Sequence, residues 1–270
     1  MNKVALITGA SSGIGFETTR LLATKGYAVY AAARRVDKMQ ELEKSGVRIL
    51  KMDVTDEQSM VEGVNKILAA EKRIDVLVNN AGYGSYGALE EVPLSEARYQ
   101  FEVNIFGMAR LTQLVLPTMR QQHSGKIINI SSIGGKIGEP HGTWYHATKF
   151  AVEGLSDSLR MELKQFGIDV VIIEPGAIIT EWAKISREHM MKVSGNGPYK
   201  ELVKKHYNMY ETADKRGSKP IVVAKTIVKA ILSNRPKTRY ATGGGAKAIL
   251  FMRRILPDRI FDKVLLSLMK

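Results

Sequence analysis

The sequence predicts a single α/β domain with a doubly wound parallel sheet, in which a layer of helices covers each face. Short apolar runs rich in strand-forming residues alternate with helical patterns as far as residue 176, and such alternation is typical of parallel sheets between helices. A glycine-rich turn joins the first strand to the first helix. With 270 residues, 44% of them hydrophobic, the chain is long enough to bury one large core.

The first strand is predicted over residues 3–8, and a helix follows to about residue 25. A turn with Gly9, Gly13 and Gly15 separates them, and a strand over residues 27–33 completes a βαβ unit. Glycine lets the chain turn tightly and lets a pyrophosphate approach the backbone at the helix N-terminus. We therefore interpret residues 9–15 as a nucleotide-binding loop, with the spacing G-x-x-x-G-x-G.

The end of the second strand indicates which nucleotide binds. At this position an acidic residue binds the ribose 2′-hydroxyl of NAD, whereas an arginine accommodates the 2′-phosphate of NADP. Here Arg34 and Arg35 follow the strand, and the first carboxylate is Asp37. The sequence therefore favours NADP(H), with a solvated basic turn as the alternative.

Strands and helices continue to alternate along the chain. Strands are predicted over residues 46–52, 74–78, 126–131, 169–173 and 237–242, and helices over residues 38–45, 56–72, 95–121, 144–166 and 220–234. Ser95 is expected to cap the third of these helices. Inside that helix Asn104 interrupts an apolar stretch, so its amide is expected to need a hydrogen-bond partner.

Polar and glycine-containing segments follow three of the predicted strands. They are Asn79-Asn80-Ala81-Gly82, Ser132 and Pro175-Gly176. In an open α/β sheet, ligands bind outside the carboxyl ends of the strands. We therefore expect these residues and the glycine-rich turn to line one cleft.

A hydroxyl, a phenol and an amine occur close together after residue 130. Ser132 precedes Tyr145 by thirteen residues and Lys149 follows it by four, so the phenol and the amine share one face of a helix. A tyrosine has an ordinary pKa of about 10, and a nearby ammonium group lowers that pKa. The three side chains favour proton transfer to a carbonyl or from an alcohol, with the serine holding the oxygen. A chance spacing in a helix is the alternative.

Two C-terminal segments lie outside the regular alternation. Residues 177–219 follow the last cofactor-side strand and contain Trp182 with several methionines and tyrosines, so we expect a partly helical lid over the cleft. Solvated surface helices are the alternative. Residues 246–270 form a basic amphipathic tail, broken at Pro257. The tail is expected to pack on the body or on a second subunit, and contact with a membrane surface is the other option.

Composition argues against several other kinds of site. The chain has no cysteine, and its five histidines include no H-x-x-x-H pair, so no metal site is expected. The net charge is +13, but the basic residues are spread along the chain without a nucleic-acid module, so no nucleic-acid partner is expected. The N-terminal apolar run is short for a signal peptide, and no apolar stretch reaches the roughly 18 residues of a spanning helix. A cytoplasmic protein is therefore expected.

Together these motifs resemble those of the short-chain dehydrogenase/reductase family. The resemblance runs from about residue 3 to residue 180 and rests on Thr8-Gly9-x-x-x-Gly13-x-Gly15, Asn79-Asn80-Ala81-Gly82, Asn104, Ser132, Tyr145-x-x-x-Lys149 and Pro175-Gly176. It implies a Rossmann fold and direct hydride transfer between nicotinamide and a substrate carbon, without a metal. Within the family, residues 33–35 and 145–150 are most similar to hydroxysteroid and retinol dehydrogenases.

The resemblance implies a role for each motif residue. Tyr145 is the general acid/base, Ser132 orients the substrate oxygen, and Lys149 lowers the tyrosine pKa and binds the nicotinamide ribose. Asn104 holds a water that links Lys149 to solvent. The residues expected to bind the cofactor are Gly9, Ser11, Ser12, Gly13, Ile14, Gly15, Arg34, Asp53, Val54, Asn80, Ala81, Gly82, Tyr145, Lys149, Pro175, Gly176 and Thr180.

The sequence thus predicts an NADP(H)-dependent oxidoreductase acting on a carbonyl or secondary alcohol of an apolar substrate, such as a steroid, a retinoid or a fatty ketone. An NADP(H)-binding sensor or scaffold that acts through protein partners is the alternative. The intact set of Asn104, Ser132, Tyr145 and Lys149 argues against that alternative. The resemblance also implies a homodimer or homotetramer formed through the helices at residues 95–121 and 144–166.

Overall fold

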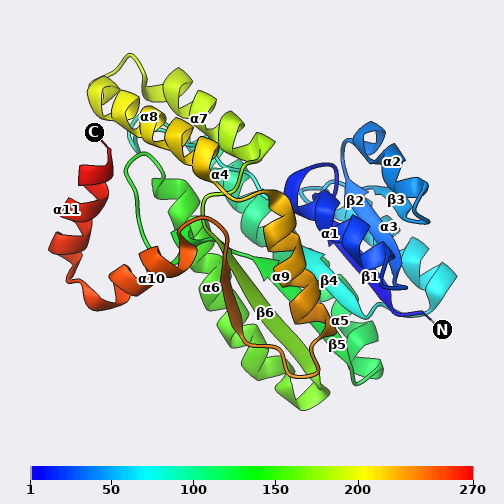
Figure 1. Ribbon diagram of the computed structural model, residues 1–270. Helices are drawn as coiled ribbons and strands as arrows, with labels where there is room; N and C mark the ends of the chain where they lie inside the picture. Colours follow the sequence, from blue (N-terminus) through cyan, green and yellow to red (C-terminus); the bar gives the residue numbers. More distant parts are fainter. Residues whose placement is uncertain (1, 270) are drawn as a thin grey trace.

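The computed structural model describes residues 2–269, and its centre is one sheet of seven strands (Figure 1). The strands are β1 (Val4–Thr8), β2 (Ala28–Ala33), β3 (Arg48–Lys51), β4 (Val76–Asn79), β5 (Gly125–Ile130), β6 (Ile168–Pro175) and β7 (Arg239–Thr242). They lie in the order β3-β2-β1-β4-β5-β6-β7, and every neighbouring pair is parallel. The predicted sheet is confirmed, and its order reverses between β1 and β4, where ligands bind in such sheets.

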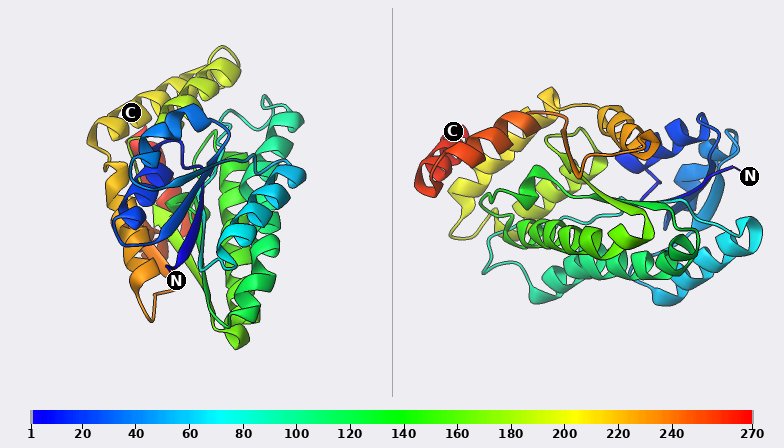
Figure 2. Two further views of the ribbon diagram at one scale, coloured as in Figure 1. Left: turned by 90° about the vertical axis from the view of Figure 1, so that its right-hand side faces the viewer. Right: turned by 90° about the horizontal axis from the view of Figure 1, so that it is seen from below.

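Helices cover both faces of the sheet, as the two views of Figure 2 show. One face carries α1 (Gly13–Ala23), α2 (Gln40–Glu43) and α9 (Pro220–Leu232), and the other carries α3 (Glu57–Glu71), α5 (Gly107–Gln121) and α6 (Thr143–Leu163). In β1, Ala5 and Ile7 pack into the first core, whereas Val4 and Leu6 pack into the second. Successive strand residues point to opposite faces, so a strand covered on both sides is apolar throughout.

The helix predicted over residues 95–121 differs from the structure at its start. It begins at Leu94 directly after Pro93, so Ser95 is not its cap. Proline has no backbone N–H and its fixed φ suits a helix entry, which explains the earlier start. A π-helical segment, Glu102–Phe106, separates α4 (Leu94–Phe101) from α5. Such π-turns occur frequently at functional sites.

Other boundaries differ from the predicted ones by up to three residues, and three short segments are 3-10 turns. These turns are η1 (Val36–Met39), η3 (Ile133–Gly135) and η4 (Lys164–Phe166). The predicted helix over residues 38–45 is therefore the end of η1 followed by the short α2 (Gln40–Glu43). Only η3 bears on the site, because it directly follows Ser132.

The predicted lid segment folds as two well-formed helices, α7 (Glu181–Ser194) and α8 (Lys200–Arg216). The two helices lie side by side at one end of the domain (Figures 1 and 2). Trp182 and Ile185 of α7 and Tyr210 of α8 line the large cleft described below. Side chains of the segment therefore border the cleft, and the segment contains more helix than expected, while its role as a lid stays a prediction.

The tail forms α10 (Ala246–Ile255) and α11 (Asp258–Leu268), with the break at Pro257 as predicted. Phe261 and Leu265 of α11 are buried against Ile137, so the tail packs on the body of its own chain. Large apolar side chains that stay exposed on the tail are Phe251, Ile255, Ile260, Leu266 and Leu268. None of the helices between residues 2 and 269 is long and apolar enough to cross a membrane.

Candidate active site

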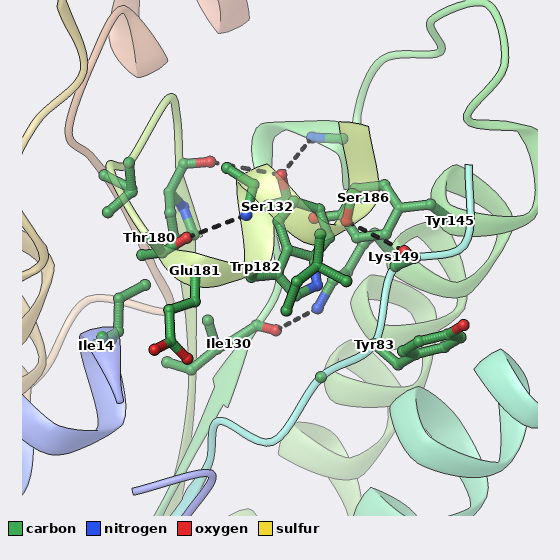
Figure 3. A pocket seen from close by; sticks show the side chains of 18 of the residues that line it. Ile14, Tyr83, Ile130, Ser132, Tyr145, Lys149, Thr180, Glu181, Trp182 and Ser186 are labelled. Atoms are coloured by element: carbon green, nitrogen blue, oxygen red, sulfur yellow. Dashed lines mark hydrogen bonds between the residues drawn. The ribbon is translucent and has the colours of Figure 1, made fainter. Parts of the chain in front are cut away.

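A cavity of about 1060 Å³ lies beyond the carboxyl ends of the strands, and Figure 3 shows part of it from close by. It is lined by Gly9, Ser11, Ser12, Gly13, Ile14, Arg34, Asp53, Val54, Asn80, Ala81, Gly82, Ser132, Tyr145, Lys149, Pro175, Gly176 and Thr180. Of the predicted site residues, only Gly15 and Asn104 are buried behind its wall. Among the described residues, no group of three or more histidines and acids could hold a metal ion.

The glycine-rich turn needs glycine for two separate reasons. Gly9 and Gly13 have φ values of 64° and 55°, in the left-handed region that other residues rarely adopt. Gly15 has no room for a side chain, because a Cβ there would lie 2.4 Å from the Gly9 carbonyl oxygen and 2.5 Å from Asn80 Nδ2. No side chain caps α1, since the Ser12 hydroxyl makes no capping hydrogen bond. The N–H groups of the first turn of α1 are therefore available to an anion.

Thr8 holds the glycine-rich turn and the segment after β4 together. Its hydroxyl oxygen accepts hydrogen bonds from the backbone N–H groups of Asn80 and Ala81, both at 3.0 Å. The Asn80 amide returns bonds to the carbonyl oxygens of Thr8 at 2.9 Å and Gly9 at 3.2 Å. The sequence analysis included Thr8 in the glycine-rich motif but predicted no role for its side chain. That role depends on the parallel pairing of β1 with β4.

Asn104 lies in the π-helical segment and hydrogen-bonds protein groups through both its amide nitrogen and its oxygen. Its Nδ2 donates to the Tyr83 carbonyl oxygen at 2.8 Å and to Thr148 Oγ1 at 3.0 Å, and its Oδ1 accepts from the Tyr83 N–H at 2.8 Å. The predicted need for a partner is confirmed. The side chain fixes the loop after Gly82 against α6, which carries Tyr145 and Lys149.

Ser132, Tyr145 and Lys149 lie together in the cleft (Figure 3). Ser132 follows β5, where its hydroxyl accepts a hydrogen bond from the Gly134 N–H at 3.0 Å. The same hydroxyl donates to the Pro175 carbonyl oxygen at 3.5 Å, and Ser132 lowers the pKa of Tyr145. Lys149, one turn after Tyr145 on α6, donates to the Ile130 carbonyl oxygen at 2.9 Å, and its Nζ lies 5.8 Å from the centre of the tyrosine ring.

The two arginines after β2 have different surroundings. Arg34 donates to the Tyr99 hydroxyl at 2.8 Å, and its Nη1 lies 3.9 Å from Asp53 Oδ2. Arg35 donates to the hydroxyls of Ser11 and Ser12, both at 3.3 Å. Both guanidinium groups are therefore beside the cleft, and Arg35 joins the glycine-rich turn directly. The predicted site included only Arg34 of the two.

The family model described as short chain dehydrogenase matches residues 3–191, which span the glycine-rich turn, the serine, tyrosine and lysine, and most of α7. The chain belongs to the short-chain dehydrogenase/reductase family. Its reaction class is accordingly that of a dehydrogenase or reductase.

Named relatives and solved structures of the family cover nearly the whole chain. The 3-ketodihydrosphingosine reductase of Bacteroides thetaiotaomicron is 35% identical, with 97% of this chain and 96% of that protein covered. The NADPH-dependent 3-dehydrocapnine reductase of Ornithobacterium rhinotracheale is 34% identical, with 97% and 95% covered. The crystal structure of a short-chain dehydrogenase from Streptomyces avermitilis matches with a TM-score of 0.82 at 34% identity, over 98% and 95%. A Burkholderia phymatum family member in complex with NAD has a TM-score of 0.80 at 25% identity, over 94% and 92%.

The structure corrects the expected direction of the Tyr145 pKa. Burial raises the pKa of the phenol to about 12, the hydrogen bond with Ser132 lowers it in part, and the charge of Glu139 raises it. Burial lowers the pKa of Lys149 to about 8, against the raising effect of Glu153. The expectation failed because it considered only the lysine charge, whereas removal of the phenol from water is the larger effect. At neutral pH Tyr145 keeps its proton and most Lys149 side chains are charged.

The far end of the cleft contains residues that the sequence did not single out. Tyr86 lies after β4, Glu139 lies on the loop before α6, and Tyr210 lies on α8. The ring centre of Tyr145 lies 5.4 Å from that of Tyr86 and 5.0 Å from that of Trp182. These residues share no local motif, since they meet only when three distant segments pack together.

Proposed function

We propose that this family member is an NADP(H)-dependent reductase that converts the ketone of an apolar substrate into a secondary alcohol. The observation that carries the proposal is Tyr145, a phenol held in its protonated form beside the Ser132 hydroxyl and the Lys149 ammonium. A protonated phenol in a cleft can give its proton to a carbonyl oxygen, so the state of Tyr145 supports the reducing direction.

Each side chain has a distinct part in this reaction. When bound, a reduced nicotinamide supplies the hydride that the carbonyl carbon receives. Ser132 donates a hydrogen bond to the carbonyl oxygen and orients it. Tyr145 transfers its proton to that oxygen as negative charge develops there, and Lys149 stabilises the phenolate that remains. Asn104 keeps α6 and the Tyr83 loop in register for this step.

The cleft has the features that a phosphorylated dinucleotide requires. The uncapped first turn of α1 and the left-handed Gly9 and Gly13 form a backbone cradle for a pyrophosphate. In this proposal Arg34 and Arg35 hold the 2′-phosphate, and the Ser11 and Ser12 hydroxyls that Arg35 contacts lie beside it. The name of the NADPH-dependent relative supports NADP(H), while the Burkholderia phymatum family member is in complex with NAD.

An apolar ketone fits the substrate end of the cleft. Tyr86, Trp182 and Ile185 line it, and Ile249, Leu265 and Leu268 of the tail extend the apolar lining. The reductases of 3-ketodihydrosphingosine and 3-dehydrocapnine are relatives named for reduction, which supports the same direction here.

The direct test is consumption of NADPH, compared with NADH, over a panel of aliphatic, aromatic and steroidal ketones. We expect turnover of long apolar ketones with a clear preference for NADPH. Binding of NADPH without turnover of any ketone would contradict the reductase and would favour an NADP(H)-binding sensor.

Exposed apolar side chains support two proposals about partners. Phe106 and Phe150 are 56% and 49% exposed on the long helices, which supports a homodimer or homotetramer through this surface.

The exposed apolar side chains of the tail, beside Arg253, Arg254 and Arg259, support contact with an anionic membrane surface. Size-exclusion chromatography with light scattering and sedimentation with anionic vesicles test these two proposals. A monomer, or a protein that does not sediment with vesicles, would refute the respective proposal.

A further inference from the structure

A single carboxylate lies at the substrate end of the cleft, on the loop between η3 and α6. Glu139 lines the cavity with its side chain 15% exposed. Its Oε2 accepts a hydrogen bond of 2.6 Å from the Tyr210 hydroxyl, and its backbone N–H donates to His146 Nε2 at 3.1 Å. The next turn of the loop is fixed as well, because the His141 carbonyl accepts from the Gly87 N–H at 2.8 Å. The carboxylate is therefore held in place from two sides.

The charge of Glu139 is not balanced by the described residues around it. Among residues 2–269, the basic group found within 4.0 Å of its carboxylate is His206, whose Nε2 lies 3.9 Å from Oε2. Burial lowers the pKa of His206 to about 3, so this imidazole is neutral at pH 7. Burial also raises the pKa of Tyr210, which stays a neutral donor. A partly buried charge without an opposite charge is unfavourable, and a cationic ligand would relieve it.

Aromatic rings line the same part of the cleft. The ring centre of Tyr86 lies 5.9 Å from that of Tyr210 and 5.4 Å from that of Tyr145. The ring centre of Trp182 lies 5.0 Å from that of Tyr145 and 6.2 Å from that of Tyr86, and all four rings line the cavity with Glu139. Aromatic faces attract cations, most strongly when water is excluded. One carboxylate among several rings is a combination that binds an ammonium group.

The subsite is next to the reacting group. The Glu139 N–H donates to His146, the residue after Tyr145 on α6, and the ring centres of His146 and Tyr145 are 5.6 Å apart. On the other side, the Tyr210 ring that contacts Glu139 through its hydroxyl lies 5.9 Å from the Tyr86 ring, which packs on Tyr145 at 5.4 Å. The charge of Glu139 also raises the pKa of Tyr145. An ammonium group bound at Glu139 would therefore be attached near the carbonyl, and the apolar remainder would extend along the cleft.

We propose that Glu139, with the rings of Tyr86 and Tyr210, binds a cationic amine of the substrate, and that the substrate is an apolar amino ketone with its amine close to the carbonyl. The substrate class rests on the proposed reductase function, whereas binding of the amine does not require turnover.

Glu139 could instead serve only to anchor α8 through Tyr210, and two variants separate these roles. Glu139→Gln removes the charge but keeps an oxygen that can accept from the Tyr210 hydroxyl. Tyr210→Phe removes that hydrogen bond but keeps the charge and the ring. Loss of amine selectivity in the first variant and its retention in the second is the pattern expected of an ammonium subsite.

The experiment has a binding arm and a kinetic arm. In the binding arm, octylammonium and octanol are titrated into the wild-type protein and both variants by calorimetry. In the kinetic arm, kcat/KM with NADPH is measured for a long-chain 2-amino ketone and for the same ketone without the amine. We expect the wild-type protein to favour the amine by at least about tenfold in each arm, the range of a charge-assisted contact. Glu139→Gln should reduce both ratios to near one, and Tyr210→Phe should preserve them.

The outcomes distinguish this proposal from the reductase proposal. If octylammonium binds no more tightly than octanol, or if Glu139→Gln keeps the selectivity, the ammonium subsite is refuted whatever the kinetics show. If the amine binds selectively through Glu139 but neither ketone consumes NADPH, the subsite stands and the proposed ketone reduction fails.

Discussion

The two ends of the cleft are built in different ways. The cofactor end consists of backbone turns close to strand ends, held by Thr8, Asn80 and three glycines. The substrate end consists of side chains from distant segments, such as Tyr86, Glu139 and Tyr210. At the cofactor end the backbone itself forms the binding surface for the cofactor. Few substitutions there are therefore expected to be compatible with function. At the second end individual side chains determine what binds, so selectivity can change while the fold remains.

Tyr145→Phe should have the largest effect, because Tyr145 lies where the two ends meet. General acid catalysis contributes about 10²–10⁴ in rate, so we expect kcat to fall by at least about a hundredfold. The phenylalanine ring keeps the packing on Tyr86 and Trp182, so NADPH affinity should change less than about threefold. Turnover by stopped-flow absorbance and binding by NADPH fluorescence measure the two quantities. Near-normal turnover would remove Tyr145 from the mechanism.

How much the sequence predicted follows the same division. The sheet, its helices and the cofactor end were predictable because apolar periodicity and glycine turns are local properties of the chain. Gly9 and Asn80 directly follow β1 and β4, Pro175 is the last residue of β6, and parallel pairing brings all strand ends to one edge. The alternation of strands and helices along the chain was therefore enough to predict that these residues lie in one cleft.

The rest depended on packing that no local pattern encodes. Glu139 and Tyr210 are 71 positions apart in the chain, and their hydrogen bond exists only because α8 folds against the loop before α6. The direction of the Tyr145 pKa was mispredicted for the same reason, since burial is a property of the folded protein. The start of the helix at Leu94 was a local error, in which Pro93 was the overlooked signal.

Gly15→Ala tests whether the cofactor end is as restrictive as the comparison implies. The new Cβ would meet the Gly9 carbonyl oxygen at 2.4 Å and Asn80 Nδ2 at 2.5 Å, so the turn must shift. Overpacking of this kind costs about 1–3 kcal/mol, and we expect a lower Tm and NADPH binding weakened by at least about tenfold. Gly138→Ala, with nothing within 4 Å of its Cβ, is the matched control on the substrate side and should leave both unchanged. Equal effects of the two substitutions would contradict the division.

Arg34→Ala tests the selectivity of the cofactor end. Hydrogen bonds to charged groups contribute about 1.5–3 kcal/mol, so loss of a 2′-phosphate contact should lower the preference for NADPH over NADH by about ten- to a hundredfold. The ratio of kcat/KM for the two cofactors measures the preference. Arg20→Ala removes an exposed arginine that pairs with Glu17 on α1, and should leave the ratio unchanged. An unaltered ratio in Arg34→Ala would transfer the role to Arg35.

The pH dependence of ketone reduction should follow Lys149. Burial lowers the pKa of Lys149 to about 8, so its charge is present below pH 8 and is lost as the pH rises through that value. Tyr145, with its pKa raised to about 12, still carries the proton in this range. We therefore expect kcat/KM for the ketone to fall by up to about tenfold per pH unit above 8, as for loss of one essential proton. Lys149→Arg, whose guanidinium stays charged, should abolish the decline in whatever activity remains, and a flat wild-type profile to pH 10 would contradict the role of the lysine charge.

Glu181→Gln should give the smallest effect, at the point where α7 meets the cofactor end. The Glu181 carboxylate lies 3.1 Å from Arg35 Nη2 and 3.0 Å from Lys38 Nζ, so it competes with a 2′-phosphate for Arg35. Exposed ion pairs contribute at most about 1 kcal/mol, and removal of this competitor should therefore tighten NADPH binding by no more than about fivefold. NADH, which has no 2′-phosphate, should bind as before. Glu188→Gln, which alters an exposed pair with Lys184 on the same helix, is the control. Weaker NADPH binding in Glu181→Gln would mean that the carboxylate positions Arg35 for the phosphate, and that α7 supports the cofactor end instead of competing with it.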